Sequence, residues 1–363
     1  MRRFYRRYRQ AFVVLFVLVC LGALVYVGIK TKKDLDTHII SNTYAGQAMG
    51  TALKKTLFGE SVTDLESVSK EIDQCLQDFE KQISVRMEDS EVAKCNRNYA
   101  VEGVYPLSEE LLGYLRREMD IYLGSKGAFS PCIRPISELW GIEDGATTVP
   151  ADEEIQKTLG QCDPVNIELR DNGIVFHAEH MAIDFGAAGK GIGGDKVKKL
   201  LQDSSLTGAV VSIGGTVVTY GDKGNGKEWH VGIQNPRGKD GDALGVVDVT
   251  GGTIISTSGD YEKYFELDGK RYHHIFDPAT GYPAESGLMS VSIISEDGFL
   301  SDALSTACFV MGLEDGMAYA KEQGAEAIFV TTDKEVYVTD GIRKQFRIQN
   351  DAYELKKINN IDF

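Results

Sequence analysis

Apolar residues recur every three or four positions along residues 62–83, the spacing of one buried face on an amphipathic α-helix. The apolar positions of this segment are Val62, Leu65, Val68, Ile72, Leu76, Phe79 and Ile83. A second helix is predicted to begin after Ser108 and to end at Gly124, because serine caps a helix start and two glutamates follow it. Shorter helices are predicted over residues 152–159, 298–311 and 314–322, with a lysine-rich helix after residue 194.

From residue 165 onward the pattern changes to short apolar runs separated by turn residues, which is typical of β-strands. Residues 165–170 and 173–178 flank an Asp-Asn-Gly turn, and two aromatic-rich runs flank Asp268-Gly269, so each pair is predicted to form a hairpin. Further strands are predicted over residues 47–58, 181–185, 208–221, 229–234, 243–250, 253–258, 288–294, 327–332 and 335–339. Helices lie mostly early and strands late, without a regular βα repeat, which favours an α+β fold.

The first 29 residues differ from the rest of the chain. Residues 1–10 contain five arginines, and residues 11–29 are apolar or small, close to the roughly 20 residues that span a bilayer. We predict a basic cytoplasmic tip (1–10), one transmembrane helix (11–29), a tether (30–45), a large domain (46–350) and a C-terminal tail (351–363), with the domain outside the cytoplasm of a bacterial cell. A cleaved signal peptide, or lipidation at Cys20, is the alternative to an uncleaved anchor.

Charge and cysteine content exclude two classes of protein. The formal net charge of −15 leaves no basic surface for nucleic acid, so nucleic-acid binding is not expected. The six cysteines show neither a C-x-x-C pair nor the spacing of a metal site. We expect those outside the predicted membrane span to be free, buried thiols.

Two segments contain residue types that suit phosphate chemistry. Residues 186–194 form a glycine-rich turn before a helix, where backbone N–H groups can approach an anion, although the spacing matches neither a dinucleotide motif nor a P-loop. The hairpin around residue 268 ends at His273, His274 and Asp277, and a histidine near neutral pH suits proton transfer.

A possible metal site lies on the predicted helix over residues 298–311. Asp302 and Thr306 are four residues apart and therefore share one helix face, where a carboxylate and a hydroxyl can be presented to one hard cation. The alternative is that Asp302 caps the start of the helix, which is a frequent use of aspartate.

Five separated stretches, in order, resemble the FAD:protein FMN transferase (ApbE) family. They are Met49-Gly50-Thr51; Ala128-Phe129-Ser130 with Leu139-Trp140-Gly141; residues 184–191; residues 274–278; and residues 302–306. The resemblance implies an α+β fold of antiparallel sheets backed by helices, T-fold-like, with FAD in a cleft. It also implies Mg²⁺-dependent transfer of FMN from FAD to a Thr or Ser hydroxyl of an extracytoplasmic acceptor protein with a D-G-A-T/S-like motif, with release of AMP.

The resemblance also implies roles for single residues. His274 would be the general base, and Asp302, Thr306 and the main-chain carbonyl of Ala187 would hold Mg²⁺. Residues implied to line the FAD site are Met49, Arg86, Ala128, Phe129, Ser130, Asp184, Lys190 and Phe276. Arg86 stands where many members carry an aromatic residue beside the flavin ring, and Thr216 stands where an aspartate is frequent.

Two other functions use nearly the same residues. A Mg²⁺-dependent FAD pyrophosphatase would release FMN and AMP to water and differ only in its products. A non-catalytic flavin-binding electron-transfer module would bind FAD without cleaving it, but binding alone does not require a site for a hard metal ion.

Overall fold

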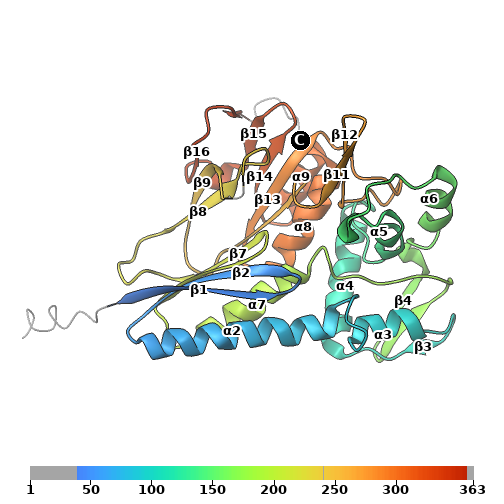
Figure 1. Cartoon of the computed structure of the whole chain (residues 1–363), viewed down its shortest axis with the longest axis horizontal. Helices are drawn as coiled ribbons and strands as arrows, with labels where there is room; N and C mark the ends of the chain where they lie inside the picture. The colour runs from blue at the N-terminus through green and yellow to red at the C-terminus, as the bar shows by residue number, and fades with distance from the viewer. Residues whose placement is uncertain (1–38, 240, 358–363) are drawn as a thin grey trace, which may run out of the picture. The chain divides into compact units, whose positions relative to one another are not determined.

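A nine-stranded sheet forms the centre of the structure, a computed structural model that describes residues 39–239 and 241–357 (Figure 1). Its strands, in spatial order, are β1 (Ile40–Ala48), β2 (Thr51–Gly59), β6 (Gly208–Ile213), β7 (Thr216–Gly221), β10 (Ile254–Gly259), β13 (Leu288–Ser295), β14 (Glu326–Thr331), β15 (Glu335–Val338) and β17 (Glu354–Leu355). From β2 to β15 neighbouring strands are antiparallel, and β17 pairs parallel with β15. Strands β13 and β14 are buried on both faces, as expected of a sheet covered on two sides.

One face of this sheet is covered by helices. They are α2 (Val62–Ile83), α7 (Gly189–Gln202), α8 (Gly298–Met311) and α9 (Leu313–Glu322). The strand register places Val211, Val218 and Ile254 on this face, and alternate residues point to the other. Helices α7 and α8 therefore lie side by side over the middle of the sheet (Figure 1).

The opposite face is partly covered by a three-stranded sheet. Its spatial order is β16 (Phe346–Ile348), β9 (Ala243–Val249) and β8 (Trp229–Gln234). Trp229, Val231 and Val247 pack with Ile255 and Ile328 of the large sheet in one apolar cluster. This packing holds β8 above the large sheet as an outer strand.

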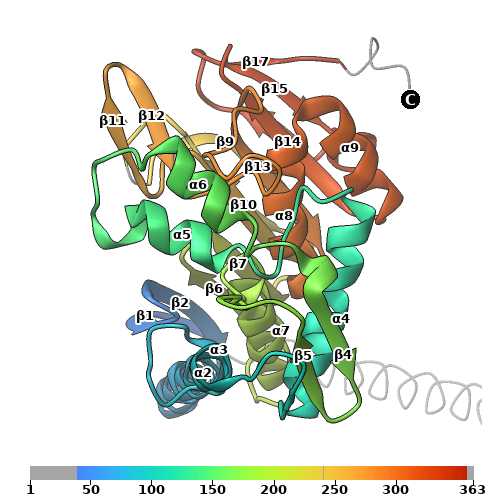
Figure 2. The same ribbon diagram turned by 90° about the vertical axis from the view of Figure 1, so that its right-hand side faces the viewer.

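The remaining elements surround the two sheets (Figure 2). They are α3 (Glu91–Asn98), α4 (Glu109–Gly124), α5 (Arg134–Trp140), η1 (Ile142–Asp144), α6 (Asp152–Leu159), η2 (Pro164–Asn166), η3 (Asp340–Ile342), a small sheet of β3 (Val104–Tyr105), β5 (Gly173–Phe176) and β4 (Ile167–Arg170), and the hairpin β11 (Tyr264–Leu267) and β12 (Lys270–His273). Trp140 stacks with Tyr272 and contacts Phe276, so α5 and the β11–β12 hairpin share one aromatic core.

Much of the predicted secondary structure is confirmed. Helix α2 covers residues 62–83, Ser108 caps α4, and α8 covers residues 298–311. The hairpin at Asp268-Gly269 is also confirmed, with positive φ at both turn residues. The antiparallel sheets backed by helices confirm the α+β class, and the five cysteines among the described residues are free thiols.

One predicted strand is wrong. Residues 181–185 do not form a strand, because Met181 and Ile183 donate their N–H groups to side chains of Tyr99 and Asn96 instead of to a neighbouring strand. Strand β1 begins at Ile40, within the range predicted as a tether, and β17 lies within the range predicted as a tail. Helices α3 and α5 lie where the sequence predicted no helix.

The described residues from Ser41 onward form one compact unit. In residues 39–239 and 241–357 there is no helix both long enough and apolar enough to cross a membrane. The predicted tip and membrane span, residues 1–10 and 11–29, lie outside the described residues.

Candidate active site

Helices α7 and α8 meet at their N-terminal ends through Gly191 and Asp302. The Gly191 N–H donates a 2.9 Å hydrogen bond to Oδ2 of Asp302, whose side chain is buried. A Cβ atom at Gly191 would lie 1.9 Å from the carbonyl oxygen of Gly298, so only glycine permits this approach. The helix cap is Asp297, which accepts from Leu300, so the alternative that Asp302 is a cap is wrong.

Lys190 is the cation beside this carboxylate. Burial raises the pKa of Asp302, while Lys190 and two backbone N–H groups act in the opposite direction. The pKa of Lys190 is raised, chiefly by Asp302 and also by Glu262, Glu143 and Asp184. One lysine therefore stays charged among four carboxyl groups from different parts of the chain.

Hydroxyl groups connect α8 to the end of β10. The Ser258 hydroxyl lies 3.1 Å from that of Thr306 and 2.7 Å from that of Ser305. One turn earlier on α8, Ser301 contacts Ser256 at 2.9 Å. These contacts orient Thr306 on the same helix face as Asp302.

The described residues hold no group of three or more His, Cys, Asp and Glu side chains that could bind a metal ion. The predicted magnesium ligands are of other kinds. They are the Asp302 carboxylate, the Thr306 hydroxyl and the main-chain carbonyl of Ala187. Ala187 lies in the turn just before α7, where Phe185 accepts hydrogen bonds from the N–H groups of Ala188 and Gly189.

The two adjacent histidines have different surroundings. His273 is buried, with Nε2 3.1 Å from the Ala284 carbonyl and Nδ1 accepting from Ile275 N–H. In contrast, Nδ1 of His274 is buried without a hydrogen-bond partner. Burial lowers the pKa of His274 to about 4, which keeps the imidazole neutral at pH 7.

Two members of an ion-pair network, Glu143 and Lys263, act electrostatically on His274. Arg86 pairs with Asp144 and with Glu143, and Lys263 donates to Glu143 at 2.7 Å. Burial alone would raise the pKa of Glu143, but Lys263, His274 and Arg86 together lower it to about 2. The carboxylate of Glu143 is therefore charged at any physiological pH.

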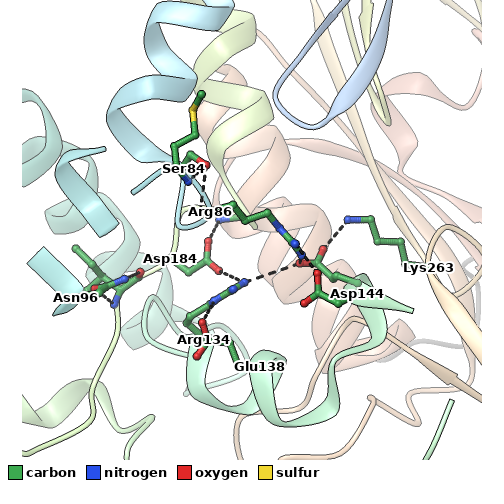
Figure 3. Close-up of polar contacts among 12 residues, drawn as sticks. Ser84, Arg86, Asn96, Arg134, Glu138, Asp144, Asp184 and Lys263 are labelled. Carbon is green, nitrogen blue, oxygen red and sulfur yellow. Dashed lines mark hydrogen bonds and ion pairs between the residues drawn. The ribbon is translucent and has the colours of Figure 1, made fainter. Parts of the chain in front are cut away.

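Arg134 extends this network to Asp184. Its buried guanidinium lies 3.7 Å from Asp184 and 4.0 Å from Glu143, and it donates to Glu138 at 2.8 Å (Figure 3). Asp184 also accepts from the Gly186 N–H at 2.8 Å, at the entrance to the glycine-rich turn. The network thus joins two predicted FAD residues, Arg86 and Asp184.

The other predicted FAD residues lie in three places. Met49 is in the β1–β2 turn, where Glu80 accepts from the N–H groups of Met49 and Gly50. Ala128, Phe129 and Ser130 follow α4, with Phe129 buried and the Ser130 hydroxyl donating to the Cys162 carbonyl at 3.2 Å. Phe276 is buried against Trp140, 5.9 Å between ring centroids.

Sequence reasoning missed Glu143, Glu262 and Ser258. Burial raises the pKa of Glu262, and Lys190 and Asp302 are among the charges that act on it. None of the three lies in a recognisable motif, so only the fold brings them to the site. The only feature of the sequence that pointed to Glu262 and Ser258 was their position in the segment just before the β11–β12 hairpin.

The α+β fold places a lysine at the N-terminal end of α7, an arrangement that favours phosphate groups. The family model described as the ApbE family matches residues 49–329. The chain belongs to this family.

Individual relatives agree with this assignment. An FAD:protein FMN transferase of Treponema pallidum is 34% identical over 313 residues, 81% of this chain and 85% of that protein. The crystal structure of the ApbE protein from Thermotoga maritima matches with a TM-score of 0.76 at 29% identity, covering 85% of this chain and 100% of that one. The flavinyl transferase ApbE of Pseudomonas stutzeri matches with a TM-score of 0.74 at 27% identity, covering 85% and 97%.

Proposed function

We propose that this ApbE family member is an FAD:protein FMN transferase. It takes FMN from FAD and attaches it to a Thr or Ser hydroxyl of an acceptor protein. The observation that carries the proposal is the buried Asp302 beside Lys190 at the junction of α7 and α8, with a neutral His274 on which the charge of Lys190 also acts.

The reaction breaks a phosphoanhydride bond of FAD and forms a phosphoester bond to the acceptor. The acceptor hydroxyl oxygen forms a bond to the phosphorus of the FMN half of FAD, and the bond from that phosphorus to the bridging oxygen breaks. AMP leaves with the bridging oxygen, and the hydroxyl proton goes to a base. No covalent enzyme intermediate is needed, so positioning and charge stabilisation account for most of the rate.

His274 is the residue we assign as base. A general base must be unprotonated before the reaction, and burial keeps its imidazole neutral. Its Nδ1 has no partner among the described residues, so the atom is available for a proton. The charged Glu143 nearby stabilises the imidazolium that forms.

Lys190 and Arg86 are assigned to the substrate. Lys190 stays charged next to Asp302 and offsets the negative charge of the pyrophosphate. The planar guanidinium of Arg86 can stack on the flavin ring in place of an aromatic side chain. Asp184, Met49, Ala128, Phe129, Ser130 and Phe276 complete the proposed FAD site.

The residues at the α7–α8 junction fit a magnesium ion. Mg²⁺ prefers hard oxygen ligands and takes few of them from protein. Asp302, Thr306 and the Ala187 carbonyl supply one carboxylate, one hydroxyl and one carbonyl oxygen, and Ser258 orients Thr306. When bound, the ion would neutralise charge on the pyrophosphate oxygens.

The same residues would also serve an FAD pyrophosphatase, so the experiment must identify the product. We would incubate the purified chain with FAD, Mg²⁺ and a carrier protein that displays an Asp-Gly-Ala-Thr loop. A transferase adds one FMN to the intact mass of the carrier. Free FMN and AMP with an unmodified carrier would instead establish hydrolysis.

We also propose that residues 11–29 anchor the protein in a bacterial membrane with residues 1–10 in the cytoplasm. The arginine-rich start and the apolar run that follows it support this orientation. External protease added to spheroplasts should then digest the folded unit. Full protection of that unit would contradict the orientation.

A further inference from the structure

A groove of about 1100 Å³ lies on the face of the large sheet away from α7 and α8. Its floor comes from β2, β6, β7 and β10, and one wall comes from β8 and the segment after it. The lining residues used below are Ala52, Lys54, Thr257, Gly232, Glu262 and Arg271. The mechanism proposed above assigns no role to these residues.

The floor is an open strand surface. On β2, Leu53 and Lys55 are buried on the helix side, where Lys55 donates to the Ser69 carbonyl of α2. Because side chains alternate along a strand, Ala52 and Lys54 point to the groove, and both are exposed. Among the described residues Lys54 has no hydrogen-bond or ion-pair partner.

The wall presents an unpaired strand edge. Within the described part of the chain, β8 pairs with β9 and with no other strand, so half of its backbone groups have no strand partner. Such an edge is a template for an added strand. At its middle, a Cβ on Gly232 would meet only Ala243, at 3.7 Å, so the fold does not require glycine there. Glycine keeps this part of the groove open to another backbone.

One end of the groove reaches the proposed active site. Thr257 lines the groove, and its neighbour Ser258 points to the other face of β10, where it contacts Thr306 at 3.1 Å. Glu262 also lines the groove, and its charge interacts with Lys190 and Asp302. This end of the groove therefore lies near the site where FMN would be transferred.

The unmatched polar groups along the groove indicate the chemistry of its occupant. The ammonium of Lys54 is unpaired, and Nη1 of Arg271 is buried without a hydrogen-bond partner, although it lies 3.5 Å from Asp260 and Nη2 donates to Glu266. Both groups are donors, so an occupant with carboxylate or carbonyl oxygens complements them. An extended peptide with an acidic side chain supplies both kinds of oxygen.

We propose that this groove docks the acceptor protein, as an extended acidic segment that pairs with the free edge of β8 and brings its hydroxyl to the Glu262 end. The inference rests on the proposed transferase function. Main-chain pairing would provide affinity for many sequences, while Lys54 and Arg271 would select acidic ones.

The kinetic test fills the groove without touching the active site. Ala52→Tyr and Gly232→Tyr place a ring in it, and tyrosine is well tolerated in strands. Val104→Tyr is the control, since Val104 is also an exposed strand residue but lies on β3, outside the groove. With the carrier that displays an Asp-Gly-Ala-Thr loop, both groove variants should raise the acceptor KM by about tenfold or more, a change of about 1.4 kcal/mol. FAD affinity and acceptor-independent FAD cleavage should not change, and an unchanged acceptor KM in both variants would overturn the proposal.

Hydrogen exchange separates docking from catalysis. Adding the carrier and FAD to the full-length chain should slow exchange of the β8 amides, whether or not FMN is transferred. Slower exchange of the β8 amides without FMN transfer would contradict the transferase function and support the docking site. If the carrier is at a saturating concentration and the exchange of the β8 amides is not slowed, the docking site is wrong. Complete protection of these amides before the carrier is added would also contradict it, because another part of the chain would then occupy the groove.

Discussion

The Gly191 N–H and the Asp302 carboxylate are joined by a 2.9 Å hydrogen bond across the contact between α7 and α8. This bond directs the N-terminal end of α7 toward a buried carboxylate on α8, where the helix dipole favours a negative charge. Lys190, the next residue back along α7, compensates the carboxylate. The position of Asp302 therefore depends on how closely the two helices pack.

We expect Gly191→Ala to destabilise the protein and to abolish transfer. The added methyl group would meet the Gly298 carbonyl at 1.9 Å and Asp302 at 2.6 Å, and backbone at this distance cannot move without separating the helices. Overpacking of this kind costs about 1–3 kcal/mol. Urea unfolding measures the loss.

Gly113→Ala is the matched control for this substitution. Gly113 lies within α4, and a Cβ there meets nothing within 4 Å. Alanine should stabilise this helix by about 0.5–1 kcal/mol. Equal changes in the free energy of unfolding for Gly191→Ala and Gly113→Ala would contradict the role of close helix packing at Gly191.

The protonation of His274 can be followed directly by NMR. Its pKa is lowered from 6.5 to about 4, so its ring resonance should not titrate near pH 6.5, and His274→Asn should remove this resonance. Between pH 6.5 and pH 4 the imidazole binds a proton in the unfolded chain but not in the folded chain. The contribution of His274 to the free energy of unfolding therefore falls as the pH drops from about 6.5 to about 4. A midpoint near 6.5 would contradict a buried neutral base.

His274→Asn should also slow transfer by about 10²–10⁴-fold, the usual contribution of a general base. FAD affinity should change much less, because the base acts on the acceptor hydroxyl. Fluorescence titration of FAD and single-turnover transfer measure the two effects separately. A rate within a factor of two of the unmodified protein would move the base to another residue.

Arg86→Ala is expected to weaken FAD binding by about three- to tenfold, since a cation stacked on a ring contributes about 1 kcal/mol. Arg86→Tyr should restore much of the affinity by replacing one planar group with another. Arg116→Ala is the control, because Arg116 is a similarly exposed arginine whose ion-pair partner, Asp171, lies in a distant turn. Unchanged binding in Arg86→Ala would place the flavin ring elsewhere.

Elements with strong local signals could be predicted from the sequence. The apolar period of residues 62–83 predicts α2, and the cap at Ser108 with the glycine at residue 124 predicts where α4 begins and ends. The turn at Asp268-Gly269 defines its hairpin because both residues adopt positive φ. At these positions the local sequence was sufficient to predict the helix or hairpin.

Elements that depend on distant partners could not be predicted. Residues 181–185 look like a strand, but the partners of their N–H groups are side chains that come from α3 and the residue after it. Glu143 reaches Lys263 across 120 positions of the chain, and Glu262 carries no motif. Motif residues identify the reaction, whereas their electrostatic neighbours depend on the tertiary fold.

The most direct test of the account is the Mg²⁺ dependence of FMN transfer in Asp302→Asn. The substitution keeps the shape of the side chain and removes one ligand charge, and Thr306→Val removes a neutral ligand at nearly constant volume. We predict that FAD binding persists in both variants. At limiting Mg²⁺ the transfer rate should fall by about 10²-fold or more in Asp302→Asn and by less in Thr306→Val, because the lost carboxylate charge acts mainly in the transition state. Asp297→Asn, which can still cap the same helix, should transfer normally. Near-normal transfer by Asp302→Asn at limiting Mg²⁺ would contradict the account and place the metal site elsewhere.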